Sequence, residues 1–226
     1  MNLSVSVEAP VSVPPFAARV RSALGALRVL MRDKGRLDQV LVFAQAVNAG
    51  ALGRAAQTLG ERAEGERLLR ELPRIDREHV DYAALRALPD GTLGREYVRF
   101  LDDNEIGPEP FEKLPEVGDP RVAFIMLRLR QTHDLWHVLT GYRPDVRGEI
   151  LLQAFTYAHV GAPSAFFLAF FGTLRWARLD IGHLAALRVA YRRGKRTKAL
   201  AMFRWEDHWA RSLAEVRQML GGLEPA

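Results

Sequence analysis

The chain has 226 residues, of which 48% are hydrophobic and 26% charged, a composition typical of an ordinary folded protein. Because it contains no cysteine, disulfides and thiolate metal sites are excluded, and any bound metal must rely on His, Asp and Glu. The net charge of +5 favours anionic surroundings, such as nucleic acid, acidic lipid head groups or a phosphorylated ligand.

The N-terminal stretch "MNLSVSVEAPVSVPPFAARV" contains Glu8 and has no basic residue before Arg19. A secretory signal begins with a positive region, and a mitochondrial presequence is rich in arginine and poor in acids, so neither is predicted. Three prolines (Pro10, Pro14, Pro15) instead predict a flexible leader over residues 1–15. We expect a single helical domain to follow over residues 16–226.

Helical periodicity dominates from Phe16 onward, and neither the alternation typical of strands nor an internal repeat is found. We therefore predict an all-α fold, a single-domain helical bundle with long irregular connections. The first helix, "FAARVRSALGALRVLMR" (16–32), is amphipathic and basic. Its apolar stripe either packs on the core, which is the interpretation that we favour, or lies on an anionic membrane. The stripe consists of Phe16, Val20, Leu24, Leu27 and Met31.

Two helical stretches follow, one ending at Gly50 and one over residues 52–72. The second resembles a DNA-binding helix-turn-helix in composition, but no recognition helix with clustered Arg, Asn or Gln follows it. We therefore expect no nucleic-acid partner. Residues 105–120 contain four prolines and form a long irregular connection. We interpret this connection as a loop within one domain, because neither side of it has a self-sufficient core.

Helix boundaries are clearest in the second half of the chain. Asp119 and Pro120 suit the N-cap and first position of a helix that we expect to run to about Thr140 and to end at Gly141. A second helix is predicted from about 146 to 160, an apolar one over 164–179, a basic one over 182–194 and a last one from about 201 to 221. The uniformly apolar part, 162–174, is too short to cross a membrane, so it predicts a buried helix or the wall of an apolar ligand tunnel.

His133 and His137 lie one turn apart on the same face of the predicted helix. Asp134 lies about 100° around the helix from His133, near enough to approach the same point. Zinc proteases with a His-Glu-x-x-His sequence use this spacing, but Asp134 is shorter than their glutamate, so a protease is disfavoured. Alternatively, a histidine and an aspartate in a buried helix merely satisfy each other, and the spacing alone leaves both interpretations open.

A further metal ligand must come from another segment. Glu149 opens the next helix, which the loop through Gly141 and Pro144 can fold back antiparallel. Gly148 has no side chain at the point where the two backbones would approach. Two histidines and one or two carboxylates suit Zn²⁺, Fe²⁺ or Mn²⁺. The other four histidines, at 79, 159, 183 and 208, are isolated in sequence and are expected to be structural.

The pattern H-D-x-x-H-x11-E over residues 133–149 resembles the signature of a coenzyme Q (ubiquinone) biosynthesis family, the fourth protein in the conventional numbering of that pathway. The resemblance extends over roughly residues 20–222. Further segments are similar to that family and occur in its order: "LPDGTLGREYVRFLD", "RGEILLQAF", "GAP", "LAFFGTLR", "RRGKR" and "WEDHWARSLAEVRQMLG".

The resemblance implies an all-helical, homodimeric, peripheral membrane protein of ubiquinone biosynthesis. By position, the metal ligands would be His133, Asp134, His137 and Glu149, and catalysis would act through the bound metal. Zinc is the metal most expected, with iron or manganese as alternatives. The implied activity is metal-dependent oxidative decarboxylation and hydroxylation at ring carbon C1 of a polyprenylated benzoquinone precursor. The alternative is a non-enzymatic lipid-binding scaffold that organises the other ubiquinone biosynthesis proteins and holds a structural metal.

Two further expectations follow from this resemblance. Because no presequence is found, a bacterial or processed form is implied rather than a mitochondrial precursor, and the expected location is the cytoplasmic face of a bacterial inner membrane. A polyprenylated substrate or another isoprenoid lipid needs a long apolar slot, lined by Phe155, Phe166, Phe167 and Phe170, unless these are ordinary core residues. "YRRGKRTK" at 191–198 has five basic residues in eight, and either contacts anionic head groups or forms an exposed interhelical turn.

Overall fold

The computed structural model describes residues 13–32, 37–107, 119–175 and 181–225. Within these ranges the chain forms eleven α-helices, two short 3-10 helices and no strand, which confirms the predicted all-α fold. Residues 1–12 and 108–118 lie outside them, so the division into a leader and a domain stays a prediction. The helices are α1 (Phe16–Arg32), α2 (Leu37–Gly60), α3 (Ala63–Glu71), α4 (Tyr82–Arg86), α5 (Leu93–Asp103), α6 (Pro120–Gln131), α7 (His133–Thr140), α8 (Val146–Val160), α9 (Pro163–Arg175), α10 (Ile181–Arg196), η1 (Leu200–Met202), η2 (Trp205–His208) and α11 (Leu213–Met219).

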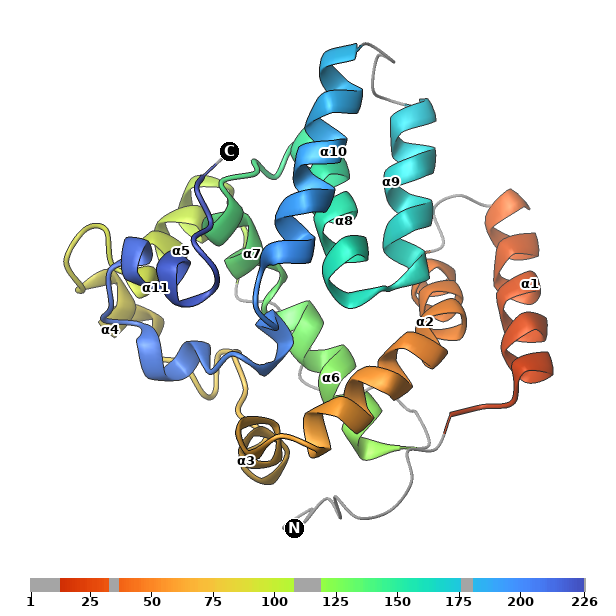
Figure 1. Ribbon diagram of the computed structural model, residues 1–226, viewed down its shortest axis with the longest axis horizontal. Helices are drawn as coiled ribbons and strands as arrows, with labels where there is room; N and C mark the ends of the chain where they lie inside the picture. The colour runs from red at the N-terminus through yellow and green to blue at the C-terminus, as the bar shows by residue number, and fades with distance from the viewer. Residues whose placement is uncertain (1–12, 33–36, 108–118, 176–180, 226) are drawn as a thin grey trace.

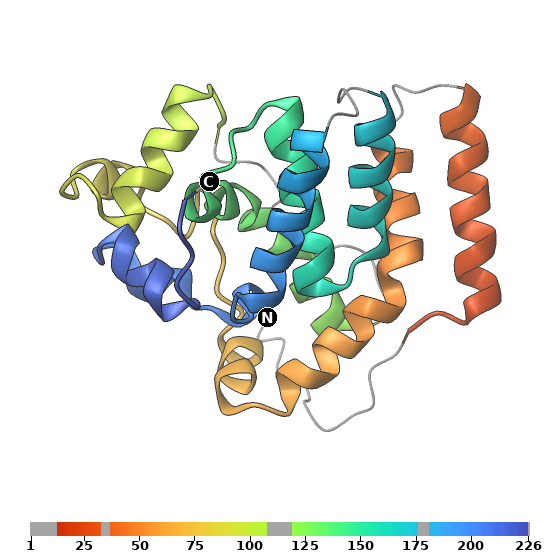
Figure 2. The same cartoon turned by 45° about the horizontal axis from the view of Figure 1, so that its top comes forward.

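Helix α8 is central to the arrangement, because both α9 and α10 pack against it. Figures 1 and 2 place α1 at one edge of the molecule, against α2, and α4, α5 and α11 toward the opposite edge. Helix α7 lies between them and contacts α5, α6 and α8. The segment with the two histidines is therefore surrounded by helices from distant parts of the chain.

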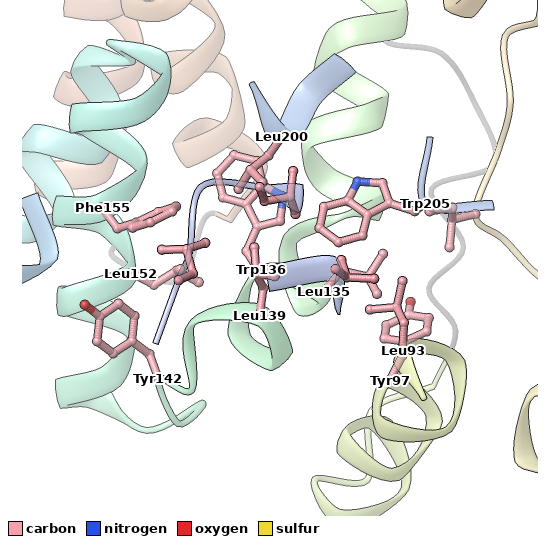
Figure 3. Close-up of a cluster of buried hydrophobic side chains, with 14 of the residues drawn as sticks. Leu93, Tyr97, Leu135, Trp136, Leu139, Tyr142, Leu152, Phe155, Leu200 and Trp205 are labelled. Carbon is pink, nitrogen blue, oxygen red and sulfur yellow. The ribbon is translucent and has the colours of Figure 1, made fainter. Parts of the chain in front are cut away.

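The main hydrophobic core surrounds α7. Leu135, Trp136 and Leu139 are buried on one face of this helix, in one cluster with Leu152 and Phe155 of α8 (Figure 3). The indole of Trp136 meets the ring of Phe155 edge-on, at a centroid distance of 6.2 Å. Burial of each large apolar side chain contributes about 1.5–3 kcal/mol. This face fixes the rotation of α7 and directs its two histidines toward α5 and α8.

Three expected helices are shorter in the structure. The helix expected over 119–140 breaks at Thr132 into α6 and α7, where the buried Thr132 hydroxyl donates to the carbonyl of Arg128 at 2.9 Å. The stretch 52–72 divides into the end of α2 and α3, which lie so close that a Cβ on Gly65 would collide with the carbonyl of Leu59. The last helix begins only at Leu213, because Ser212 and Glu215 form a capping box there.

The apolar stripe of α1 does not pack on the core, which corrects the interpretation favoured from the sequence. Phe16, Leu24 and Leu27 are 73%, 60% and 43% exposed. The helix contacts α2 and buries the small Ala26 instead. Large side chains on this stripe therefore remain available to a partner.

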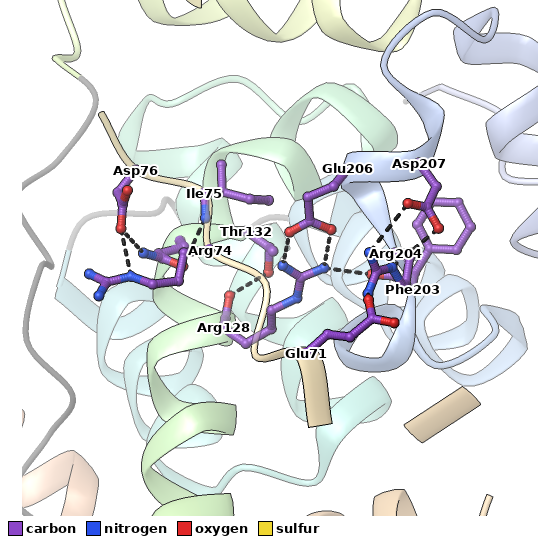
Figure 4. A network of polar contacts seen from close by, with 11 residues as sticks. Glu71, Arg74, Ile75, Asp76, Arg128, Thr132, Phe203, Arg204, Glu206 and Asp207 are labelled. Atoms are coloured by element: carbon purple, nitrogen blue, oxygen red, sulfur yellow. Dashed lines mark hydrogen bonds and ion pairs between the residues drawn. The ribbon is translucent and has the colours of Figure 1, made fainter. Parts of the chain in front are cut away.

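A polar network joins α6 to the C-terminal segment (Figure 4). The side chain of Arg128 is 0% exposed, forms an ion pair with Glu206 of η2 and donates to the carbonyl of Phe203 at 2.8 Å. Nearby, Gln131 accepts from the amide of Ile75 at 3.1 Å and donates to Asp76 at 3.4 Å. These bonds hold η2 and the segment before α4 on α6.

We predict that Glu206→Ala lowers the free energy of unfolding by about 3–5 kcal/mol, because it leaves the Arg128 charge buried without a counter-ion. Urea denaturation checks this. Asp102→Ala, which breaks the exposed pair between Arg86 and Asp102, is the control and should cost only about 0–1 kcal/mol. Equal losses for the two variants would contradict a special role for the buried pair.

Candidate metal centre

The two histidines of α7 lie side by side. His133 is the first residue of this helix and His137 follows one turn later, with ring centroids 5.0 Å apart and ring planes at 87°. The helix ends at Gly141, which has φ of 76° and donates its amide to the carbonyl of His137 at 2.8 Å. This left-handed residue turns the chain sharply after the histidines.

Glu149 reaches the histidines because the chain turns back tightly before α8. A Cβ on Gly148 would collide with the carbonyl of Arg143, so only glycine permits this approach, which is to the connecting loop and not, as expected, to the preceding helix. Asp145 caps α8 by accepting from the amide of Gly148 at 2.8 Å. The carboxylate of Glu149 then lies 3.0 Å from Nε2 of His137 and 3.6 Å from Nε2 of His133.

His137 is the most constrained of the three side chains. It is 0% exposed, and Phe100 of α5 stacks on its ring at 5.4 Å and 16°. Its Nδ1 lies 2.9 Å from the carbonyl oxygen of Tyr142, and because a carbonyl only accepts, Nδ1 must carry the proton. In the neutral tautomer Nε2 therefore presents a lone pair toward Glu149.

The contact between His137 and Glu149 is short enough for an ion pair but is not aligned as a good hydrogen bond. Nε2 of His137 is buried and has no hydrogen-bond partner within the described chain. Two electron-rich atoms at this separation repel each other unless a proton or a cation lies beside both of them. Metal-bound histidines normally donate their other ring nitrogen to a carbonyl, as His137 does. The arrangement therefore fits a metal ligand.

The local electrostatics keep Glu149 ionised. Burial raises the pKa of Glu149, but the polar contacts with His133 and His137 outweigh burial and lower it to about 2. Burial lowers the pKa of His133, but the contact with the Glu149 carboxylate raises it by more. The pKa of His133 therefore lies above its usual value. The ionised carboxylate is the form that binds a divalent metal, whereas a metal at this site would have to displace any proton held on His133.

The three ligand atoms have the spacing of a metal site. They all lie within 4.8 Å of one another. Ligand atoms around a tetrahedral zinc ion are about 3.3 Å apart, given zinc–ligand distances of about 2.0–2.1 Å. The side chains of His133 and Glu149 are 35% and 40% exposed, so the cluster is open on one side. A metal held here would keep coordination positions free for another ligand.

Asp134 does not belong to this cluster of three ligand atoms, although the family resemblance implied that it would be a ligand. It lies on another side of α7, where burial raises its pKa. Its charge acts on the cluster and also on the phenols of Tyr82 and Tyr97. Its role as a ligand therefore stays a prediction.

Two arginines hold the end of α7, and sequence reasoning missed both. Arg217 of α11 donates to the carbonyls of Leu139 and Val138 at 2.9 and 3.0 Å. Arg193 of α10 donates to the carbonyl of Thr140 at 2.8 Å and lies 4.9 Å from the ring centre of Tyr142. These carbonyls have no partner within the helix, so the arginines fix both α7 and the residue that orients His137.

The phenylalanines expected to line a slot divide into three groups. Phe166 and Phe170 line an almost wholly apolar groove of about 430 Å³ between α8, α9 and α10. Phe167 does not line this groove. Its ring meets that of Phe43 of α2 edge-on, with the ring centroids 5.9 Å apart. Phe155 is fully buried in the core, which corrects its assignment to the slot. The other residues of the groove include Tyr157, Leu174, Leu184, Leu187, Arg188 and Tyr191.

Histidines outside the cluster have structural contacts, with one exception. His159 donates to the carbonyl of Gly194 at 3.2 Å and accepts from the amide of Leu200 at 3.0 Å. His79 contacts Asp76 at 2.6 Å, and His183 contacts Thr173 at 3.3 Å. Nδ1 of His208 is buried and has no hydrogen-bond partner in the described residues.

Comparison with known proteins decides the family. The model of the family described as "Coenzyme Q (ubiquinone) biosynthesis protein Coq4" matches residues 12–225. The chain belongs to this family. A Coq4-family relative from Xenopus tropicalis, named as a mitochondrial ubiquinone biosynthesis protein, is 33% identical over 202 residues, 89% of this chain and 72% of the relative. The human protein of the same name is 31% identical over 90% of this chain and 77% of its own length.

A solved structure supports the same assignment. The crystal structure of a proposed ubiquinone biosynthesis protein from Nostoc punctiforme is similar with a TM-score of 0.70 and 26% sequence identity. The similarity covers 90% of this chain and 98% of the other. The resemblance to a ubiquinone biosynthesis family is thereby confirmed.

The expected location at the cytoplasmic face of a bacterial inner membrane is wrong by this comparison. The curated relatives from Xenopus and human are named as mitochondrial proteins. The expectation depended on the composition of the first residues, and that composition does not determine a compartment. Within the described ranges, none of the helices combines the length and the apolar character needed to cross a membrane.

We predict that His137→Ala and Glu149→Ala abolish stoichiometric metal binding, because each removes one of three ligand atoms. Asp134→Asn should retain it, since Asp134 lies outside the cluster. Inductively coupled plasma mass spectrometry after dialysis measures the metal content of each variant. Loss of metal from Asp134→Asn, equal to that from Glu149→Ala, would restore Asp134 as a ligand.

Gly148→Ala tests the tight turn. The added methyl group must displace α8 from the backbone of Arg143, so we expect at least tenfold weaker metal binding, measured by competition with a chelator, and a stability loss of about 1–3 kcal/mol. Gly25→Ala is the control, because a Cβ there meets no other atom within 4 Å. Unchanged metal affinity in Gly148→Ala would show that Glu149 is not positioned by this contact.

Proposed function

We propose that this chain is a metal-dependent enzyme of ubiquinone biosynthesis that removes the carboxyl group at ring carbon C1 of a polyprenylated precursor and hydroxylates that carbon. Membership in the Coq4 family supports the pathway. The observation that supports catalysis is the open triad of His133, His137 and Glu149. A structural zinc site normally has four protein ligands, whereas this cluster offers three and is exposed on one side.

The residues of the chain have distinct roles in this proposal. His133, His137 and Glu149 would hold Zn²⁺, Fe²⁺ or Mn²⁺. A bound metal would supply Lewis acidity toward the ring carboxylate or phenolate and, with iron, redox chemistry that uses dioxygen as oxidant. The carbonyl of Tyr142 keeps the proton of His137 on Nδ1, and Phe100 covers one face of that ring. Both contacts keep Nε2 directed at the reacting side.

The apolar groove is suited to the isoprenoid tail. It lies on α8, the helix that also bears Glu149, and Tyr157 of this helix lines it. With a rise of 1.5 Å per residue, Tyr157 lies about 12 Å along the helix axis from Glu149. A ligand with its ring at the metal centre and its tail in the groove therefore needs only a few isoprene units to span this distance. Phe166 and Phe170 form the opposite wall.

Exposed apolar side chains support contact with a membrane surface, from which such a substrate comes. In α9, Phe171 and Leu174 are 58% and 55% exposed. Phe16 and Leu24 of α1 are also exposed, beside the exposed cations Arg21 and Arg28. An apolar stripe flanked by arginines is the pattern of a helix that lies in an anionic membrane interface. Homodimer formation and contact with other ubiquinone biosynthesis proteins belong to the same proposal.

The alternative is a non-enzymatic scaffold that binds lipid and holds the metal for structural reasons. The burial of His137 supports it, because this candidate ligand is packed into the interior beside Phe100, and Arg217 and Arg193 hold the end of the same helix. The two functions differ in what the metal ligands must do. A scaffold needs the metal only to hold its folded surface, whereas an enzyme needs the metal for the reaction.

A turnover assay separates the two functions. Purified protein loaded with Zn²⁺, Fe²⁺ or Mn²⁺ is mixed with the prenylated, C1-carboxylated precursor in air, and CO₂ and the hydroxylated ring are quantified. We expect turnover with at least one metal and none with Glu149→Ala, while the exposed control Arg192→Ala stays active. No turnover with any metal, together with full rescue of ubiquinone synthesis in a deficient strain by Glu149→Ala, would exclude the enzyme and favour the scaffold.

A further inference from the structure

In the basic stretch at 191–198, Arg193 holds the end of α7 through the carbonyl of Thr140. The two lysines of this stretch line two cavities away from that contact. Lys195 lines a cavity of about 430 Å³, and Lys198 lines another of about 590 Å³. Ala199 and Met202 line both cavities, so the two adjoin on either side of this short segment. We call the two cavities together the basic groove. None of its lining residues belongs to the metal cluster or to the apolar groove.

The two cavities contain different charges. In the smaller one, between α2 and the end of α10, the charged side chains are Arg54 and Lys195, and no carboxylate lines it. The larger one lies between α3 and the segment from η1 to α11. It is lined by four cations and two carboxylates, namely Arg62, Arg67, Lys198, Arg204, Glu64 and Asp207.

Most of these charges are not neutralised. Arg204 forms ion pairs with Glu71 and Asp207, and Arg67 pairs with Glu71 (Figure 4 shows those of Arg204). By contrast, four exposed cations of the groove have no carboxylate partner in the described part of the chain: Arg54, Arg62, Lys195 and Lys198. The lining carboxylate that remains unpaired is Glu64. The groove therefore has a surplus of positive charge on facing walls.

The floor of the groove is apolar and held in place before any ligand binds. Met202, Phe203 and Leu220 line the larger cavity, and His208 stacks on Phe203 at 4.7 Å with its Nδ1 buried and unpartnered. Arg128 holds the carbonyl of Phe203, as Figure 4 shows. A preformed pocket with an apolar floor and a few charged groups at fixed positions is the usual form of a small-ligand site.

We propose that the basic groove binds the phosphate group of an organic phosphate, with the carbon part of the ligand on the apolar floor. Lysine and arginine side chains donate only, and a phosphate offers several acceptor oxygens with up to two negative charges. Each cavity offers two cations without a carboxylate partner, Arg54 and Lys195 in the smaller and Arg62 and Lys198 in the larger, although Lys195 also lies 5.9 Å from the ring centre of Tyr191. Two such cations on facing walls match a phosphate better than a single carboxylate. The phosphate belongs either to a soluble ligand or to a lipid head group, and its recognition is the same for both. This site is independent of the proposed catalysis at the metal.

Two probes distinguish the sources. Phenyl phosphate, titrated by calorimetry, represents a soluble organic phosphate. Flotation with phosphatidylcholine vesicles, with and without phosphatidic acid, represents a lipid head group. Binding of phenyl phosphate supports the soluble source, and binding only to vesicles that contain phosphatidic acid supports the lipid source. Binding of neither probe by the metal-loaded protein would overturn the proposal.

Charge-reversal variants locate the binding. Lys195→Glu/Lys198→Glu and Arg54→Glu/Arg62→Glu change opposite walls, and each should weaken binding about tenfold or more. Arg147→Glu/Arg192→Glu makes the same change of charge at exposed positions outside both the groove and α1, and should bind as the original protein does. Equal weakening in this control would overturn the proposal, as would loss of phenyl phosphate binding in Glu149→Ala, which would move the ligand to the metal centre. Thermal unfolding confirms that each variant is folded.

Discussion

The contact between the backbones of Gly148 and Arg143 is the constraint on which the candidate metal centre depends. It returns α8 against the end of α7, so that a carboxylate from one helix meets two imidazoles from another. A side chain at position 148 would separate the helices before Glu149 could reach Nε2 of His137. The hydrogen bond from His137 to Tyr142 arises in the same turn, so one short loop both supplies the third ligand and orients the second.

The part of the site that was predictable from the sequence is the part built from local geometry. Spacing of one helical turn placed His133 and His137 on one face, and Gly141, Pro144 and Gly148 indicated the return of Glu149. Helical periodicity likewise predicted the fold class. Asp134 was assigned by resemblance, and it is absent from the group of three ligand atoms that the structure brings together.

The remainder depends on contacts between distant segments, for which a single sequence has no signal. Arg193 and Arg217 are 53 and 78 residues from the carbonyls of Thr140 and Leu139 that they hold, and nothing near them in sequence identifies their partners. The same reason explains why Phe155 proved to be core while Phe166 and Phe170 line a groove. The apolar stripe of α1 has the periodicity of a packed helix, yet it faces outward. Periodicity identifies an apolar face but does not identify the surface that this face contacts.

The two arginines also impose an order of events during synthesis. The last carbonyls of α7 gain their partners only after residues 193 and 217 have left the ribosome, when most of the 226 residues exist. Until then the helix with both histidines has a free end, and its third ligand lies on a helix whose neighbour α10 is still missing. The nascent chain therefore cannot complete the packing around α7 until α10 and α11 have been synthesised, so the end of this helix is fixed late in folding.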